Sequence, residues 1–403
     1  MKILVLSRLY WPDTVAVAQH LGDYTFALAE AGHSVTVLTS THAYEDPKIT
    51  WAEQETHQGV EIIRIDHQAA DKSSRLKRIL DFAWFNLLIF WKALTIKGKY
   101  EVILGLTNPP LLSLFGVIIA RLRGSKFCYW TMDLQPELAI EAGYIKARSL
   151  TALGLTWMGN LIFRQSNAII ALDTYMRDHI VRRGGRPDRI AVLPPWPVMA
   201  QVYEGARMDN TFRLQQGFGD KIVIMYSGNH AVVHPLDTLL AAALHLRDDP
   251  RFLFVFIGGG VRKQDVTQFK AQHHLDNILQ LPYQPRDVIH LSLGSADLQV
   301  VIMGDGHVGY THPNKIYGAM YIGKPILYIG PRPSHIDDIL TVCPGNISVQ
   351  HGDGIALRDA LLEFATAHES VWTEIGRQNR IYAHRNFEPQ NLIQQHRRVI
   401  ERL

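Results

Sequence analysis

Two series of alternating strand-like and helix-like segments, separated by a cluster of prolines, constrain the fold of this chain more than any other feature. The apolar run Ile3–Ser7 precedes a segment with helical apolar spacing, Val15–Glu30, and a second apolar run, Ser34–Thr39. This order predicts a βαβ unit, with parallel strands covered by helices on both faces. Further strands of this first series are expected at Gly59–Ile65, Val102–Leu106, Lys126–Trp130, Ala168–Ala171 and Ile190–Leu193.

The segment Pro194–Pro197 interrupts this pattern, because three prolines in four residues cannot continue a helix or a central strand. A looser stretch follows, and the alternation restarts with a strand at Lys221–Tyr226. With 403 residues, the chain is also too long for one ordinary core. We therefore predict an α/β protein with two doubly wound parallel sheets. Its expected parts are a first domain (1–196), a linker (197–220), a second domain (221–385) and a helix (386–403) that either domain could hold. In such sheets, ligands bind beyond the carboxyl ends of the strands, here facing a central cleft.

The composition favours a soluble globular protein, with 47% hydrophobic and 20% charged residues. The net charge of +3 is too small to indicate nucleic acid as a partner. The two cysteines, Cys128 and Cys343, lie far apart and outside any CxxC pattern, which argues against a disulfide framework or a zinc site. The first residues lack the pattern of a cleavable signal peptide, so we expect a cytoplasmic protein.

Residues 298–330 contain the clearest candidate binding site. An apolar run ends in a glycine-bearing loop, Pro313 is expected to open a short helix, and Gly323 to close it. The start of a helix offers unpaired N–H groups and a partial positive charge, to which Lys315 adds a full charge. This combination predicts an anion site that fits a diphosphate. The alternative is a solvated lysine at a helix end.

Several blocks of sequence resemble the GT-B glycosyltransferases of the family 4 type, and together they span nearly the whole chain. In the first half they are LYWPDTVAVAQHLGDYTFALAEAGHSVTVLTS, TNPPLLSLFGVIIARLRGSKFCYWTMDLQPELAIEAGYI and the crossover LPPWP. In the second half they are YSGNHAVVHPLDTLL, FIGGGVRK, LPYQPRDVI and PNKIYGAMYIGKPIL. No single block is specific, but their order along the chain is.

The resemblance implies two Rossmann-like domains and the transfer of a hexosyl or N-acetylhexosaminyl group with retained anomeric configuration. The donor would be a nucleotide sugar, UDP- or GDP-linked, held by the second domain. The acceptor would be a saccharide or a polyprenyl-diphosphate-linked glycan of bacterial surface polysaccharide synthesis, held by the first domain. Such enzymes usually need neither a bound cofactor nor a metal ion.

On the donor side, the resemblance assigns donor binding to Gly228, Asn229, His234, Gly258, Gly259, Arg262, Asn314 and Lys315. Relatives commonly have Arg and Lys at the positions of Asn229 and His234, so Lys315 and Arg262 are expected to neutralise more of the charge. The glycines at 258–260 could equally be an ordinary turn at the end of a strand. Tyr283 either borders the base or lies at the edge of the core.

Two glutamates that flank the donor in relatives align with Tyr310 and Gly318 and are absent from this chain. Asp337 and Asp338 could replace them as ligands of the ribose. Acidic residues at these two positions could also simply stabilise the start of a helix.

On the acceptor side, Asp133 and Glu137 follow a buried strand, and Asp133 could orient the acceptor hydroxyl and take its proton. Asp133 could instead cap the turn that follows it. The loop Pro12, Asp13, Thr14 follows the first strand and would contact the acceptor. In the front-face reaction argued for such enzymes, the leaving diphosphate helps to deprotonate the acceptor, so that no nucleophile of the enzyme is required.

Residues 75–99 contain a basic lead, two tryptophans and a basic tail, which are typical of a helix at a membrane interface. Asp81, Asn86 and Lys92 interrupt the apolar run, which disfavours a transmembrane helix. The segment therefore either contacts the cytoplasmic face of the membrane peripherally or forms a buried helix of the first domain.

Two other functions fit the same sequence. A nucleotide-sugar epimerase could use the same architecture. The absent glutamates and the Asn229 and His234 replacements could also mark a catalytically silent homologue that acts as a binding partner.

Overall fold

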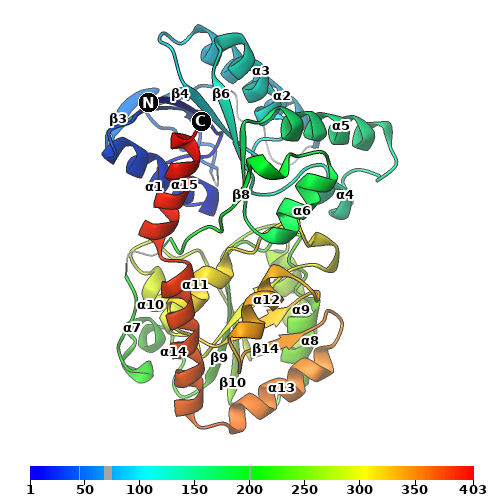
Figure 1. Cartoon of the computed structure of the whole chain (residues 1–403). Coiled ribbons are helices and arrows are strands. Elements are labelled where there is room, and N and C mark those ends of the chain that lie inside the picture. Colours follow the sequence, from blue (N-terminus) through cyan, green and yellow to red (C-terminus); the bar gives the residue numbers. More distant parts are fainter. Residues whose placement is uncertain (45, 68–74, 199–200) are drawn as a thin grey trace. The chain divides into compact units, whose positions relative to one another are not determined.

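The computed structural model describes residues 1–403 apart from residues 45, 68–74 and 199–200. The chain forms two compact units, each built on a sheet with helices packed against it (Figure 1). Unit 1 comprises Met1–Pro195, Gly309–His312 and Pro389–Leu403, and unit 2 comprises Trp196–Val308 and Pro313–Glu388. The prediction of two parallel-sheet α/β domains is confirmed.

Unit 1 contains an eight-stranded sheet in the order β3-β4-β2-β1-β5-β6-β7-β8. Its strands are β1 (Lys2–Leu6), β2 (Ser34–Ser40), β3 (Gln54–His57), β4 (Val60–Ile65), β5 (Val102–Leu106), β6 (Lys126–Trp130), β7 (Ala168–Ala171) and β8 (Ile190–Val192). All pairs are parallel except β3 with β4. β3 was not predicted, because its sequence QETH is polar and lacks the alternation that signals a strand.

The helices of unit 1 connect these strands. They are α1 (Ala16–Glu30), α2 (Arg75–Thr95), α3 (Leu112–Arg123), α4 (Glu137–Glu141), α5 (Leu150–Gln165), α6 (Thr174–Arg182), the short η1 (Pro187–Arg189) and, from the end of the chain, α15 (Pro389–Glu401). α2, α3 and α5 pack side by side (Figure 1).

The last helix, α15, packs within unit 1. Leu392, His396 and Ile400 recur every four residues and are buried. The hydroxyl of Tyr24, on α1, donates a hydrogen bond to the carbonyl of His396 at 2.8 Å. The helix that the sequence left unassigned is therefore part of the first unit.

Unit 2 contains a six-stranded parallel sheet in the order β11-β10-β9-β12-β13-β14. Its strands are β9 (Ile222–Ser227), β10 (Phe252–Ile257), β11 (Ile278–Leu281), β12 (Leu298–Ile302), β13 (Ile326–Ile329) and β14 (Ile347–Val349). The chain runs outward from β9 to β10 and β11, then returns to the other side of β9 at β12. The strand order therefore reverses between β9 and β12, where doubly wound sheets bind ligands.

The helices of unit 2 cover both faces of this sheet. They are η2 (Arg207–Asp209), α7 (Thr211–Gln215), α8 (Asp237–His245), α9 (Lys263–His273), α10 (Ile289–Gly294), η3 (Asp305–His307), α11 (Lys315–Tyr321), α12 (His335–Val342), α13 (Gly354–Thr366) and α14 (Glu369–Asn386).

Residues 207–220, which the sequence pattern assigned to a linker, are part of unit 2. Phe212 and Phe218 are buried in an apolar cluster with Val223 and Met225 of β9. Arg207 forms a salt bridge with the buried Asp297 through Nε and Oδ1 at 2.5 Å. The aromatic pair and the ion pair fix this stretch against the sheet.

Candidate functional site

Two glycine-bearing loops meet beyond the carboxyl ends of β9 and β10. Gly228, Gly258 and Gly260 have φ angles of 131°, 128° and 122°, which side chains with a Cβ rarely adopt. A Cβ on Gly258 would overlap the carbonyl oxygen of Gly228, and one on Gly260 would overlap Oδ1 of Asn229. The two loops can therefore touch only because these residues are glycines. An ordinary turn at the end of a strand would not require such close contact.

Lys315 lies against the same loops. A Cβ on Gly228 would stand 2.7 Å from Cε of Lys315, and Nζ lies 4.9 Å from the centroid of the Tyr226 ring. Burial lowers the pKa of Lys315 to about 8. Within the described part of the chain, no carboxylate forms an ion pair with this ammonium. The structure thus brings Lys315 to the glycine loops with its charge uncompensated.

The helix that carries Lys315 begins two residues later than predicted. α11 starts at Lys315 and not at Pro313, because the backbone first forms tighter i to i+3 bonds. Ile316 N donates to Pro313 O, and Tyr317 N donates to Asn314 O, each at 3.3 Å. The predicted end is confirmed, since Gly323 follows the helix with a φ of 78°. Oδ1 of Asn314 is buried, with no hydrogen-bond partner among the described residues.

Three histidines lie near Lys315, of which the sequence analysis had assigned only His234 to the donor. His230 Nδ1 lies 3.1 Å from Gly259 O, and a Cβ on Gly304 would stand 2.7 Å from Nδ1 of His307. Burial lowers the pKa of His234 well below its ordinary value, and Lys315, His307 and His230 add to this effect. His230 and His307 follow β9 and β12, so their positions at strand ends could have indicated them.

Arg262 and Tyr283 differ in their contacts at these loops. The Arg262 guanidinium lies 3.3 Å from Asp237 Oδ2 and 3.2 Å from Asp265 Oδ2, so two carboxylates already balance its charge. The Tyr283 hydroxyl donates to Gly259 O at 3.4 Å, and its ring packs against the same glycine. Tyr283 therefore borders the glycine loops, while Arg262 adjoins them through its backbone N, which donates to His230 O at 3.0 Å.

Asp337 and Asp338 occupy the first turn of α12. Asp337 N donates to the capping Ser334 Oγ at 3.2 Å, and its carboxylate lies 3.3 Å from Nε of Arg332. These contacts agree with acidic residues that stabilise a helix start.

In unit 1, Asp133 follows β6 with an exposed side chain. Its backbone N donates to Thr107 Oγ1 at 3.4 Å, and no described N–H donates to its carboxylate. Surrounding protein reduces the hydration of the carboxyl group and raises its pKa to about 6, while His312 acts in the opposite direction. Asp133 therefore does not cap the turn, and it has the pKa of a group that can accept a proton near neutral pH.

His312, whose charge acts on the pKa of Asp133, is held by a buried carboxylate. His312 Nδ1 lies 2.8 Å from Asp173 Oδ2, and both side chains are buried. Asp173 Oδ1 also accepts a hydrogen bond from Met176 N at 2.7 Å and so caps α6. No local sequence pattern indicates this pair, because its members are 139 residues apart.

Glu137 is part of an ion-pair network. Its Oε1 accepts hydrogen bonds from Arg183 Nη1 at 2.6 Å and from His179 Nε2 at 2.8 Å. Burial alone would raise the pKa of Glu137, but His179 and Arg183 outweigh burial and hold it below its ordinary value. Glu137 is therefore ionised and bound to fixed partners, which suits positioning better than proton transfer.

The loop Pro12, Asp13, Thr14 links β1 to α1. Asp13 N donates to Tyr10 O, and Asp13 Oδ1 accepts a hydrogen bond from Tyr44 N, each at 3.0 Å. The side chain of Gln19 donates to Thr14 O. These bonds tie the loop to α1 and to the segment after β2.

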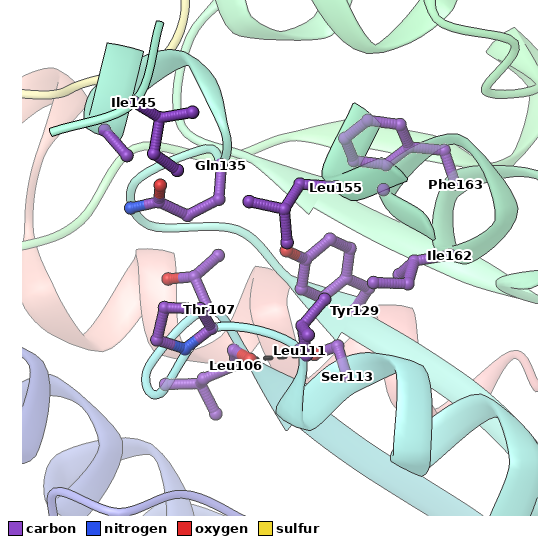
Figure 2. Close-up of a pocket in the computed structure, with 13 residues that line it drawn as sticks. Leu106, Thr107, Leu111, Ser113, Tyr129, Gln135, Ile145, Leu155, Ile162 and Phe163 are labelled. Carbon is purple, nitrogen blue, oxygen red and sulfur yellow. Dashed lines mark hydrogen bonds between the residues drawn. The ribbon is translucent and has the colours of Figure 1, made fainter. Parts of the chain in front are cut away.

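A pocket in unit 1 opens beside Thr107. Its lining is mostly apolar and consists of Leu106, Thr107, Pro110, Leu111, Ser113, Tyr129, Gln135, Ala139, Ile145, Leu155, Gly159, Ile162 and Phe163. Figure 2 shows Thr107 and Gln135 on one side of the pocket, opposite Tyr129, Ile162 and Phe163.

The chain is similar in sequence to known glycosyltransferases. Residues 16–196 match the family described as the glycosyl transferase 4-like domain. Over 412 aligned residues the chain is 23% identical to WcaI of Escherichia coli strain K12, a protein named as a candidate glycosyl transferase of colanic acid biosynthesis. The match covers 98% of both chains.

Solved structures of glycosyltransferases share the fold. Anabaena HepE in complex with UDP and glucose superimposes with a TM-score of 0.73 at 16% identity, covering all of both chains. WaaG, a glycosyltransferase involved in lipopolysaccharide biosynthesis, gives a TM-score of 0.72 at 14% identity over 98% of both chains. The two-domain arrangement of α/β sheets in this chain is therefore the GT-B fold.

Proposed function

We propose that the chain is a GT-B glycosyltransferase of the family 4 type, with residues 16–196 as its glycosyl transferase 4-like domain, and that it is a retaining enzyme using a nucleotide sugar. The donor is a UDP-sugar carrying a hexosyl or N-acetylhexosaminyl group. The acceptor is a saccharide or a polyprenyl-diphosphate-linked glycan of surface polysaccharide synthesis. The names of WcaI and WaaG support this pathway class, and the UDP bound to HepE supports the base.

The uncompensated ammonium of Lys315 beside Gly228 carries this proposal. A diphosphate brings negative charge, and the glycine loops leave room for it to approach backbone N–H groups. Neutralising the leaving diphosphate lowers the barrier to breaking the glycosidic bond of the donor. Tyr283 borders the same loops, and Asn314, which precedes Lys315, has a buried Oδ1 that is free to bind the nucleotide sugar.

Asp133 is the proposed acceptor-side group. In a front-face reaction, the acceptor hydroxyl loses its proton as the new bond forms, with help from the leaving diphosphate. The Asp133 carboxylate would orient this hydroxyl, and His312 lowers its pKa. Glu137 contributes by fixing the start of α4 through its bonds to Arg183 and His179.

Replacing Lys315 tests the donor site. Lys315→Ala should raise the dissociation constant of UDP at least about tenfold, the loss of one charge-assisted contact to a diphosphate, with little change in melting temperature. Lys221→Ala is the matched control, because Lys221 is exposed and precedes the opposite, amino end of β9. Equal UDP affinity in the Lys315 variant would refute the assignment.

A panel of UDP-, GDP- and dTDP-sugars in a thermal-shift assay identifies the base. Interconversion of the sugar when the donor is incubated alone would favour an epimerase. Donor binding without any turnover dependent on Asp133 would favour a silent homologue.

We also propose that unit 1 contacts the cytoplasmic face of the membrane peripherally. None of the helices in the described chain is long and apolar enough to cross a bilayer. α2 is buried on one face, where Phe85 and Ile89 lie in the core, and exposed on the other. It can therefore be a helix of the first domain and also contact a membrane. The exposed face of α2 carries a stripe of Leu80, Trp84, Leu87 and Trp91, which are 43–63% exposed and spaced for one side of a helix.

A further inference from the structure

The pocket of unit 1 is apolar over most of its wall and polar at one side. Ser113 Oγ already donates to Leu106 O at 2.7 Å, so this hydroxyl is engaged within the wall. Thr107 and Gln135 form the polar side, opposite the aromatic rings of Tyr129 and Phe163 (Figure 2). An apolar pocket with a few polar groups at one side is typical of a binding site for a mostly hydrocarbon ligand.

The polar side of this pocket adjoins the proposed acceptor carboxylate. Thr107, which lines the pocket, accepts the hydrogen bond from the backbone N of Asp133. Gln135 lies two residues beyond Asp133 on the same loop. A molecule whose polar end reaches Asp133 can therefore place an attached apolar chain in the pocket.

α5 forms one wall of the pocket and is apolar on a second side as well. Leu155, Gly159 and Ile162 face the pocket. On the other side, Leu150, Leu153 and Trp157 are 87%, 58% and 66% exposed. A helix with apolar residues on both sides is unusual for a surface helix in water and suits a helix next to lipid.

The exposed side of α5 continues a larger apolar surface. The neighbouring α3 exposes Ile118 and Leu122, and α2 exposes the stripe described above. Asp81 is the single acidic residue in the sequences of these three helices, and it is buried and paired with Arg8 at 2.6 Å. A surface of apolar side chains with basic but no exposed acidic partners complements an anionic bilayer.

We propose that this pocket binds the hydrocarbon chain next to the phosphate of a lipid-linked acceptor, an inference that rests on the proposed function. α5 separates the pocket from the surface that faces lipid. A chain leaving the bilayer passes beside α5 into the pocket, and its polar head remains near Thr107 and Asp133. The pocket would thereby select prenyl- or alkyl-linked acceptors over free saccharides.

Calorimetric titration with prenyl phosphates tests the proposal directly. Farnesyl phosphate should bind at least about tenfold more tightly than the shorter citronellyl phosphate, because burial of each methylene contributes about 0.8 kcal/mol. Inorganic phosphate should not compete. Ala139→Leu fills the pocket and should weaken farnesyl phosphate at least about tenfold, and Leu155→Ala should weaken it by removing wall contacts. Ala142→Leu is the control, because Ala142 follows the end of α4 and lies outside the pocket; this variant should bind farnesyl phosphate as the unmodified protein does.

Two further measurements distinguish a wrong pocket assignment from a wrong proposed function. UDP affinity should be unchanged in the Ala139 and Leu155 variants; if UDP binds and farnesyl phosphate does not, the pocket assignment alone fails. If UDP does not bind the unmodified protein, the proposed function fails. Ala139→Leu should also leave binding to phosphatidylglycerol vesicles intact. Loss of vesicle binding in this variant would show that bilayer lipid, and not an acceptor chain, occupies the pocket, and would overturn the proposal.

Discussion

His312 Nδ1 lies 2.8 Å from Asp173 Oδ2, and the other oxygen of Asp173 caps α6. One buried carboxylate thus fixes both a helix start and an imidazole. That imidazole lowers the pKa of Asp133, the group proposed to act on the acceptor. The acceptor side of the protein therefore depends on a chain of three polar residues drawn from distant parts of the sequence.

The rate of transfer should depend on pH through Asp133. The pKa of this carboxyl is raised to about 6, so the carboxylate is present above pH 6 and lost below it. Measured kcat/KM should rise from pH 5 to pH 7 with a midpoint near 6. Asp133→Asn should abolish this limb, while its UDP affinity stays unchanged.

The same shift affects stability. Because the folded pKa exceeds the ordinary value of 3.8, ionising Asp133 costs stability as the pH rises from about 4 through 6. Asp133→Asn should therefore raise the melting temperature at pH 8 relative to the unmodified protein, and the difference should shrink at pH 4. A larger gain at pH 4 than at pH 8 would contradict the assigned pKa.

Replacing His312 should move the midpoint of the pH profile. His312 lowers the pKa of Asp133, so His312→Gln should shift the midpoint above 6. A variant that merely loosened the fold would lower the rate without moving the midpoint, and this separates the two explanations.

Donor affinity should fall at high pH. Lys315 has a pKa of about 8 in the unliganded protein, so it is charged below pH 8 and increasingly neutral above it. The affinity for UDP should decrease between about pH 7.5 and about pH 8.5, where the diphosphate is fully ionised and the uracil ring still holds its N3 proton. Lys315→Arg remains charged throughout this range and should remove the decrease. If UDP affinity fell with pH as steeply in the arginine variant, a group other than Lys315 would be responsible.

Glycine is required where the two loops of unit 2 touch. Gly228→Ala places a Cβ 2.7 Å from Lys315 Cε at a φ of 131° and should destabilise the protein by about 1–3 kcal/mol. UDP affinity should fall with it, because the lysine must move. Gly154→Ala, in α5, meets no atom within 4 Å and should be neutral or slightly stabilising by urea denaturation.

The exposed tryptophans of α2 should control binding to vesicles. The double variant Trp84→Ala, Trp91→Ala should reduce partitioning onto phosphatidylglycerol vesicles at least about tenfold and leave the melting temperature within about 2 °C, since both side chains are more than half exposed. Binding should also weaken with salt. The control is Val371→Ala, because Val371 is an exposed apolar residue on α14 of unit 2 and should not contact the vesicle. Phe82 of α2 is not a suitable control, since it is half-buried and its replacement would also affect folding.

The fold could be predicted because the signal for a doubly wound sheet is local. Apolar runs and helical spacing placed most strands within one or two residues of their observed bounds. β14 was missed, since a three-residue strand such as Ile347–Val349 carries too few residues to show a pattern. The start of α11 was misplaced for a related reason: the tight first turn depends on backbone geometry after Pro313, which composition does not reveal.

The candidate site could be predicted only in part. Lys315 and the glycines were indicated by their positions after strands, and the structure brings them together. The pairing of Arg262 with Asp237 and the bond between His312 and Asp173 connect residues 25 and 139 positions apart. Such partners are fixed by tertiary packing, and a single sequence offers no periodicity from which to read them.

The course of the chain also limits how the protein can be dissected. Because α15 packs on α1 although it lies at the far end of the sequence, a fragment ending at Pro195 lacks one of its own structural elements. Such a fragment would expose Tyr24 and Trp130, whose rings now meet that of His396 edge-on. An independently expressed first half would need Pro389–Leu403 supplied as a fused or added peptide, and a stop codon near residue 388 would damage the beginning of the protein more than its end.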